Sequence, residues 1–153
     1  MTNGKQTLLY VDVTTPITTA YDAVTVANAE MVACLDNNGF SLQNADIDAT
    51  TKCSAGNYME SVLGQQSWSM SGDGKKIVVV SPDTRVDNNA LFKLARSGDY
   101  AWWFLFDIAQ ASMRYGLGKI SSFDETSPNN DAETFSISIT GSGYPGDQDD
   151  ITP

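Results

Sequence analysis

The sequence predicts a mainly β protein, a β-sandwich or half-barrel of about seven strands with one flanking α-helix. Residues Thr134–Thr140 alternate apolar and hydroxyl side chains without exception, which is the period of a half-buried strand. Most other apolar runs are short and are separated by Gly, Pro, Asn or Asp, the residues that favour turns. A convincing helical pattern occurs once, within Val86–Ser97.

The first part of the chain is expected to form one strand and one long hairpin. Thr7–Val13 reads as a strand that Thr14–Pro16 closes, and Tyr21–Leu35 reads as a long β-like segment. Asp36–Gly39 has the residues of a hairpin turn, which is a better interpretation of it than the start of a calcium loop, and Phe40–Gln43 leaves this turn as a new strand. Alternation then directs Phe40 and Leu42 to the core, and Ser41 and Gln43 outward.

Residues Asn44–Gln66 are the least periodic stretch and are predicted to be a long loop. A loop of this length in a small domain is usually functional or disordered. It carries large apolar residues, which favour docking onto another molecule such as a neighbouring copy, although folding back onto the chain's own core is the alternative. These residues are Ile47, Tyr58, Met59, Val62 and Leu63.

The middle of the chain is expected to form a second hairpin, a helix and a buried strand. Ser67–Ser71 and Lys76–Val80 would pair around the turn Gly72–Gly74. In the helix Val86–Ser97, Asp87 is the expected N-cap and Gly98 the stop. Ala101–Ile108 is apolar at both parities, so both of its faces should be covered, one of them by the helix.

The last part of the chain is predicted to form a hairpin in which Gly118–Thr126 pairs with Thr134–Thr140 through the loop Ser127–Asp131. One face of the last strand presents Ser136, Ser138 and Thr140. We expect residues 1–143 to form a single domain, and the acidic, Gly- and Pro-containing residues 144–153 to be a flexible tail.

Composition excludes several functions. The chain has 9 Lys and Arg against 19 Asp and Glu, a net charge of −10, and no basic stripe that would neutralise phosphates. It has no His, which is the commonest general base and metal ligand. No nucleophile–base pair is evident, so we expect neither an enzyme nor a cofactor.

Metal binding is not expected either. Asp46 and Asp48 share a strand face, but no further acidic ligands stand in register with them. Cys34 and Cys53 do not form a metal-binding or redox motif; we expect both to be reduced, with a single disulfide as the alternative. The N-terminus lacks an apolar leader and no apolar run would cross a bilayer, so we expect a soluble, non-secreted protein without membrane contact.

The order of several motifs resembles the major tail proteins, or tail tube proteins, of long-tailed, non-contractile bacteriophages. The resemblance covers roughly Val26 to Gly143 and departs from the family in the short acidic end. The motifs are Ala45–Lys52, then Gly64 with Ser67–Ser71, the short central helix with the aromatic strand after it, and the ending Glu133–Gly143.

This resemblance implies a self-assembling virion protein, made in the bacterial cytoplasm, whose hexameric rings stack into a tube for double-stranded DNA. It implies contacts with other tail proteins, such as the tape measure, tail terminator and distal tail proteins. The residues implied to face the lumen are Ser136, Ser138, Thr140, Ser41 and Gln43, and those implied to contact the next ring are Ile47, Tyr58, Met59, Val62 and Leu63. Small hydroxyls suit a wall from which DNA must slide freely, since each added Lys or Arg would contact a phosphate.

Two alternatives stay open at this point. The inner tube of a contractile injection system has the same general fold. A monomeric carbohydrate-binding β-sandwich could use Trp68 or Tyr58 as a stacking platform. The face that Lys119 occupies relative to Ser136 depends on strand register, which the sequence leaves undetermined.

Overall fold

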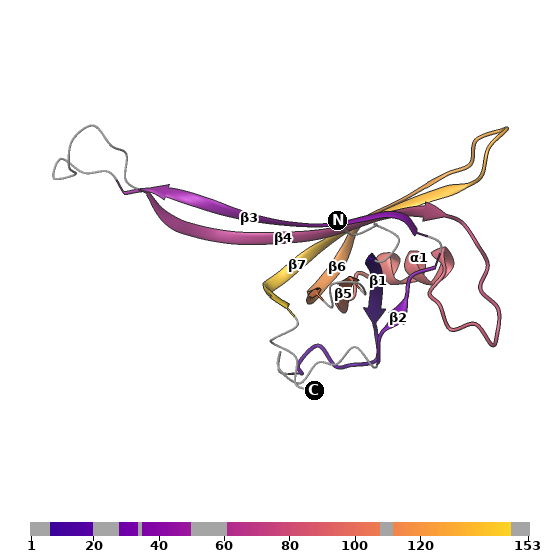
Figure 1. The fold of residues 1–153 in the computed structure, drawn as a ribbon, viewed down its shortest axis with the longest axis horizontal. Helices are drawn as coiled ribbons and strands as arrows, with labels where there is room; N and C mark the ends of the chain where they lie inside the picture. The colour runs from indigo at the N-terminus through magenta and orange to yellow at the C-terminus, as the bar shows by residue number, and fades with distance from the viewer. Residues whose placement is uncertain (1–6, 20–27, 34, 50–60, 108–111, 148–153) are drawn as a thin grey trace.

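The computed structural model describes residues 7–19, 28–33, 35–49, 61–107 and 112–147, and these form one antiparallel sheet with one helix (Figure 1). The seven strands lie in the order β2-β1-β5-β6-β7-β4-β3. The mainly β class and the single flanking helix are therefore confirmed. The elements are β1 (Thr7–Asp12), β2 (Glu30–Met31), β3 (Leu35–Asp48), β4 (Ser61–Lys75), α1 (Asn88–Ser97), β5 (Ala101–Asp107), β6 (Ser112–Thr126) and β7 (Thr134–Asp147).

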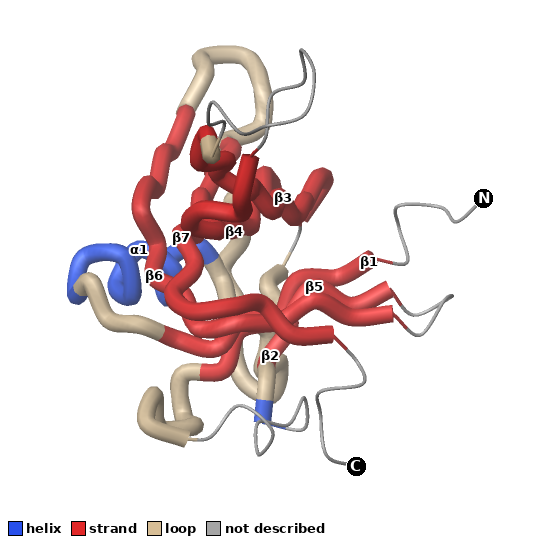
Figure 2. Tube along the Cα trace, turned by 90° about the vertical axis from the view of Figure 1, so that its left-hand side faces the viewer, coloured by secondary structure: helices blue, strands red, loops and turns tan. Residues whose placement is uncertain are grey.

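The sheet is folded over so that it forms two layers. In Figure 2, β6 and β7 curve from the layer that contains β3 and β4 toward the layer that contains β1 and β5. The register explains this: β6 pairs with β5 through residues 112–118 and with β7 through residues 114–126. Long strands that change partners along their length bend at bulges, and β6 and β7 have irregular register at two places.

The main core lies between the two layers and beneath the helix. Leu91 of α1, Trp103 of β5 and Ile139 of β7 are fully buried in the same cluster. Burial of apolar surface is worth about 25 cal/mol per Å², so this cluster stabilises the contact between the two layers and the helix. Its other buried members are Leu9, Val11, Val32, Trp68, Met70, Ala101, Ile120, Phe135 and Ile137.

The second face of β5 is buried as well, as the apolar run at both parities predicted. Trp102 and Phe104 lie opposite the core face and pack with Met113 and Tyr115 of β6. The rings of Phe104 and Tyr115 are stacked with centroids 5.6 Å apart. Both faces of β5 are therefore covered, as predicted: Trp103 is buried on one face, and Trp102 and Phe104 are buried on the other.

The helix has the ends that its sequence predicts. The Oδ1 atom of Asp87 accepts a hydrogen bond of 2.9 Å from the backbone N–H of Ala90, which is N-capping geometry. Gly98 follows with φ = 72°, the left-handed conformation that glycine adopts without strain, and its N–H donates to the Leu94 carbonyl.

Asp87 also accepts, through Oδ2, a bond of 3.3 Å from the N–H of Val79, so it fixes the chain before the helix. We expect Asp87→Ala to lower the free energy of unfolding by about 1–2 kcal/mol, because it removes both acceptors. Thermal unfolding followed by circular dichroism should show a fall in Tm of roughly 2–8 °C. Asp87→Asn keeps the helix cap and should lose about half as much; equal losses for the two variants would contradict the capping role.

The long hairpin differs from the one that the sequence predicted. Of the predicted segment Tyr21–Leu35, the described residues form the two-residue strand β2 (Glu30–Met31) and the start of β3 at Leu35; residues 20–27 and 34 lie outside the described ranges. Asp36–Gly39 is not a turn but part of β3, which pairs with β4 instead. The pairing with β4 is interrupted by a bulge between Leu35 and Asn37, and Asn38 Nδ2 donates a hydrogen bond of 3.1 Å to the Thr7 carbonyl.

The second predicted hairpin was wrong for a related reason. Gly72–Gly74 is not a turn, because β4 runs through it without interruption, and Lys76–Val80 is not a strand. Gly72 sits on the core face, where a Cβ would lie 3.2 Å from a methyl group of Leu35. The glycine therefore fits close packing against Leu35 within a strand, and not a turn.

The predicted loop Asn44–Gln66 is shorter than expected. Asn44–Asp48 belongs to β3 and Ser61–Gln66 to β4, so these strands extend beyond the rest of the sheet as a ribbon (Figure 1). Tyr58 and Met59 lie outside the described residues.

The last predicted hairpin is confirmed: β6 and β7 pair from Thr126↔Thr134 toward their other ends. The strand β7 continues to Asp147, so the expected tail boundary at residue 144 was placed too early. Residues 148–153 lie outside the described ranges.

Candidate functional site: a hydroxyl face and two free edges

One face of the sheet carries a grid of small polar side chains across β3, β4, β7 and β6. Directly paired residues of antiparallel strands point to the same side, so the register defines this grid. We call it the hydroxyl face. Its rows are Ser41–Ser69–Thr140–Lys119, then Gly39–Ser71–Ser138–Ser122, then Asn37–Asp73–Ser136–Asp124.

In β4 and β7 the residues between these positions point into the core, whereas Leu42 of β3, which was predicted to face the core, is 46% exposed. In β7, Phe135, Ile137 and Ile139 are buried, whereas Ser138 and Thr140 are exposed and Ser136 is half-buried. In β4 the same alternation holds from Ser67 to Lys75. The five residues that the sequence singled out therefore lie on one surface, with Gln43 paired to Ser67 one row beyond Ser41.

The contribution of β4 to the hydroxyl face was not predicted from the sequence. Ser69, Ser71 and Asp73 stand between the predicted Ser41 and Ser138 and link them into one surface. Their alternation with Trp68, Met70 and Gly72 indicates a strand with one polar face. The interpretation of Gly72–Gly74 as a turn ended the predicted strand at Ser71, before Asp73.

The charges on the face are few, and carboxylates outnumber ammonium groups, since Asp36 lines the same hollow as Asp73 and Asp124. Lys119 pairs directly with Thr140, so it lies on the hydroxyl face, and its Nζ is 5.8 Å from the centre of the Tyr100 ring. Asp73 and Asp124 flank Ser136 on both sides, and Lys75 extends from the next row. Hydroxyls and amides occupy the other positions, so the face offers no continuous basic track to a polyanion.

Each outer strand of the hydroxyl face has an unpaired edge. Within the described residues, β3 pairs only with β4, and residues 119–126 of β6 pair only with β7. An unpaired edge of this length is a template for pairing with another chain. The four strands alternate in direction, so β3 of one copy would meet β6 of the next in the antiparallel sense.

The ribbon at the far end of β3 and β4 carries the described residues of the predicted contact set. Ile47 pairs directly with Val62, and Leu63 stands opposite Asp46. The side chains of Ile47, Val62 and Leu63 are each more than half exposed. Ile47 and Val62 therefore share one side of the ribbon and Leu63 lies on the other side, all three away from the core.

Trp68 is not a stacking platform. It is 3% exposed, its Nε1 donates to the Gly143 carbonyl at 3.0 Å, and its ring is stacked on Phe40. The proposed carbohydrate site at Trp68 is therefore wrong, because a buried indole presents no face to a sugar. Tyr58 lies outside the described residues.

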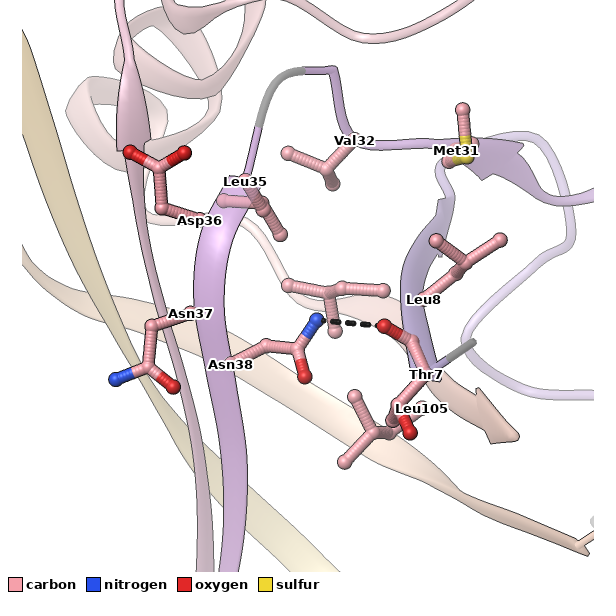
Figure 3. A pocket seen from close by; sticks show the side chains of 10 residues that line it. Thr7, Leu8, Met31, Val32, Leu35, Asp36, Asn37, Asn38 and Leu105 are labelled. Carbon is pink, nitrogen blue, oxygen red and sulfur yellow. Dashed lines mark hydrogen bonds between the residues drawn. The ribbon is translucent and has the colours of Figure 1, made fainter. Parts of the chain in front are cut away.

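A cavity of about 350 Å³ lies between β1 and the start of β3 (Figure 3). Leu8, Val32 and Leu35 surround it, while Asp36 and Asn37 lie on the other side of the β3 ribbon. Asp36 is the one titratable side chain among its lining residues, so the cavity has no acid–base pair. It does not support a catalytic site.

The carboxylates with shifted pKa values serve the fold. Burial opposes ionisation of Asp12, but hydrogen bonds from Thr15 and Thr14 outweigh it, so the pKa of Asp12 is lowered. Hydrogen bonds from Arg85 lower the pKa of the exposed Asp83. A lowered folded pKa makes Asp12 stabilising at neutral pH, and this stabilisation is lost as the pH falls through the folded value.

The described part of the chain contains no group of three or more Asp, Glu, Cys or His side chains that could hold a metal ion. It also contains no helix long and apolar enough to cross a membrane.

Comparison with known proteins identifies the family of the chain. A family model described as phage tail tube protein matches residues 1–147. No curated protein sequence matches the chain.

Three solved structures have a similar fold. The tail of an empty gene transfer agent particle, refined with C6 symmetry, has a TM-score of 0.73 at 20% identity, covering 95% of this chain and 98% of that one. The SPP1 tail tube has a TM-score of 0.67 at 12% identity, with 95% and 77% covered. The sheath–tube complex of an extracellular contractile injection system has a TM-score of 0.60 at 11% identity, with 94% and 88% covered.

Proposed function

Because the chain belongs to the phage tail tube protein family, we propose that six copies close into a ring and that the rings stack into a conduit for double-stranded DNA. Membership of the family makes the chain a structural component of the virion tail and not an enzyme. The number of copies and the passage of DNA are the steps that we add.

The observation that carries the proposal is the combination of a polar face with two free edges. If β3 of each copy pairs with residues 119–126 of β6 of the next, every exposed edge of the inner sheet is satisfied. Each copy contributes four strands of alternating direction, so the ring closes without a parallel pair. The sixfold symmetry of the similar gene transfer agent tail supports six as the number of copies.

In this arrangement the hydroxyl face lines the lumen, with Ser136, Ser138, Thr140, Ser41 and Gln43 among its residues. The core covers the opposite face of β4 and β7 in these rows, so the hydroxyl face is the side of these two strands that meets water. Few cations and many small hydroxyls keep DNA from being held at the wall. We also propose that Ile47, Val62 and Leu63 of the ribbon contact the next ring, together with Tyr58 and Met59.

The ends of such a tube require other tail proteins, and we assign the tape measure, tail terminator and distal tail proteins as partners of this chain.

An inner tube of a contractile injection system is the second candidate function, since a tube of that class shares the fold. Co-purification of this chain with a sheath protein would favour the contractile class, and tails without a sheath would exclude it.

Electron microscopy tests the proposal directly. We expect the purified chain to form rings and tubes in negative stain as its concentration rises, with sixfold end-on class averages. A higher-resolution reconstruction should place Ser138 on the inner wall. Protein that stays monomeric at every concentration, rings of another symmetry, or a hydroxyl face on the outside of the tube would contradict the proposal.

A further inference from the structure

Two exposed apolar side chains, Leu42 and Phe92, belong to the side of the sheet that is opposite the hydroxyl face. Leu42 pairs with the buried Trp68, so it points away from the hydroxyl face, yet it is 46% exposed. It lies on β3, one of the two free edges. Phe92 lies on α1 and is also 46% exposed. Single exposed apolar side chains are common, so the position of these two decides whether they belong to an interface.

Phe92 stands beside the other free edge, that of β6. Its ring centroid is 5.9 Å from that of Phe123 in β6, and Arg96 lies 5.6 Å from the centre of the same ring. Phe123 pairs with the buried Ile137, so it also points away from the hydroxyl face. Figure 2 shows α1 on the side of β6 that is turned away from β3 and β4. The helix therefore borders the edge that β3 of the next copy would join.

The tilt of strands in a closed barrel determines how far the two edges are offset. Strands about 4.8 Å apart with a rise of about 3.3 Å per residue, tilted by about 35–45°, change level by about 1–1.5 residues per strand. The four strands of one copy therefore give an offset of about 4–6 residues. Within one copy, Phe40 is level with Ile120 through Met70 and Ile139. In the next copy, Phe40 should therefore face residues 124–126 or residues 114–116 of β6.

The existing pairing of β6 selects one of these two directions. Residues 112–118 of β6 already pair with β5, so the stretch 114–116 has no free edge. Within 124–126, Glu125 is the residue that shares the side of Phe40, because Asp124 and Thr126 belong to the hydroxyl face. Phe40 then faces Glu125 of the next copy, and Leu42, two residues along β3, faces Phe123.

A bulge in β3–β4 supports this register independently. Beyond Leu42, residues Asn44 and Ala45 reach the last free positions of β6, because β5 occupies that edge from Gly118 onward. The pairing of β3 with β4 becomes irregular between Asn44 and Asp46, and a bulge bends a strand. The bend thus lies where β3 must leave the edge of its neighbour.

We infer that Leu42 of one copy packs against Phe92 and Phe123 of the next copy in the same ring. This contact lies behind the seam, the line where β3 of one copy meets β6 of the next, and it rests on the proposed tube function. Both sides of the contact are apolar, so its burial favours ring closure. On the hydroxyl face the same register places Ser41 beside Asp124 of the next copy, so the polar lining continues across the seam.

Disulfide trapping on the hydroxyl face tests the register. In a chain with Cys34 and Cys53 changed to serine, Ser41→Cys and Asp124→Cys place thiols at two exposed positions that would face each other across the seam. Within one copy these positions are three strand spacings apart, roughly 14 Å, which is too far for a disulfide. Oxidised rings should therefore give a covalent ladder that reaches the hexamer on a non-reducing gel.

Two matched pairs shift the second thiol by two residues along the same face. Ser41→Cys combined with Ser122→Cys or with Thr126→Cys should cross-link at least about fivefold fewer seams, because diagonal neighbours lie too far apart for a relaxed disulfide. A stronger ladder from either of these pairs would overturn the register. Intact rings without a cross-link in any pair would overturn it as well.

A second test retains both native cysteines and addresses the apolar contact. Leu42→Asn removes an apolar side chain from every seam, so rings should require at least about tenfold more protein. Gln43→Asn introduces the same residue at the next position, on the hydroxyl face, and should change this concentration less than about twofold. Because Leu42 and Gln43 are exposed in the subunit, both variants should keep nearly the natural Tm by circular dichroism.

The outcomes separate this contact from the tube itself. Rings from Leu42→Asn at the natural concentration, or an equal loss from Gln43→Asn, would overturn the contact while the tube function stands. The absence of rings from the unaltered chain would overturn the tube function.

Discussion

Replacing Gly141 with alanine is expected to lower the free energy of unfolding by about 4 kcal/mol, whereas Gly39→Ala should leave it nearly unchanged. A Cβ at Gly141 would lie 1.9 Å from Cε2 of Trp68, and a Cβ at Gly116 would lie 2.3 Å from the same ring. The indole lies against the backbone of β6 and β7, so neither strand can yield without losing its pairing. At Gly39, on the hydroxyl face, the nearest atom would be the Ser71 Oγ at an ordinary 3.5 Å.

The expected cost at Gly141 combines two terms. Overpacking costs about 3 kcal/mol, and displacing the indole breaks the Trp68–Gly143 hydrogen bond, worth about 1 kcal/mol. The sum, about 4 kcal/mol, is a large fraction of the total stability of a small domain, about 5–15 kcal/mol. Thermal unfolding by circular dichroism should show a fall in Tm of about 10–15 °C for Gly141→Ala.

A double-mutant cycle tests whether the loss of stability comes from the clash with Trp68 or from any substitution of Gly141 in β7. Trp68→Leu removes the ring, so adding Gly141→Ala to it should cost far less than in the natural chain. If the two substitutions were additive, the contact between Trp68 and Gly141 would not be the cause. A loss of stability in Gly39→Ala as large as that in Gly141→Ala would also contradict the explanation.

Local patterns predicted the elements whose partners are close in sequence. The alternation of Thr134–Thr140 placed a strand, and its hairpin with β6 needed only one loop to be identified. The helix was bounded by Asp87 and Gly98, whose capping roles depend on backbone within a few residues. The aromatic strand was identified because its two faces were both apolar.

The pairing of β3 with β4 could not be predicted in this way, because tertiary contacts override the turn chemistry of two segments. Asp36–Gly39 has turn residues, yet a bulge and the Asn38–Thr7 hydrogen bond keep it in the strand. Gly72 reads as a turn glycine, yet it makes room for Leu35 from a strand that is distant in sequence. The face that Lys119 occupies was likewise a matter of register, which only the paired strands determine.

Ser138→Arg is expected to reduce DNA release through assembled tails at least about tenfold while leaving tube assembly intact. Ser138 is exposed and pairs with Ser71 and Ser122, so no acidic side chain stands directly beside it to neutralise an arginine. In the proposed hexameric tube each ring would gain six cations, and their phosphate contacts would repeat from ring to ring. The measurement is the fraction of genomic DNA released from triggered particles.

Two matched variants identify the cause of any loss. Ser138→Gln adds a long side chain without charge, so it should release DNA normally if charge and not width is responsible. Ser136→Arg places the same cation between Asp73 and Asp124, which are its direct cross-strand neighbours. These carboxylates should pair with the arginine, so we expect Ser136→Arg to be clearly milder than Ser138→Arg.

The salt dependence of DNA release distinguishes an effect of charge from a narrowed lumen. A phosphate contact weakens steeply as salt rises, because binding releases counterions from DNA. Release from Ser138→Arg particles should therefore recover toward normal between low and high salt, whereas a narrowed lumen would obstruct DNA at every salt concentration. Undiminished release at low salt from particles whose tubes contain Ser138→Arg would mean that this face does not meet DNA, even if the chain still forms a tube.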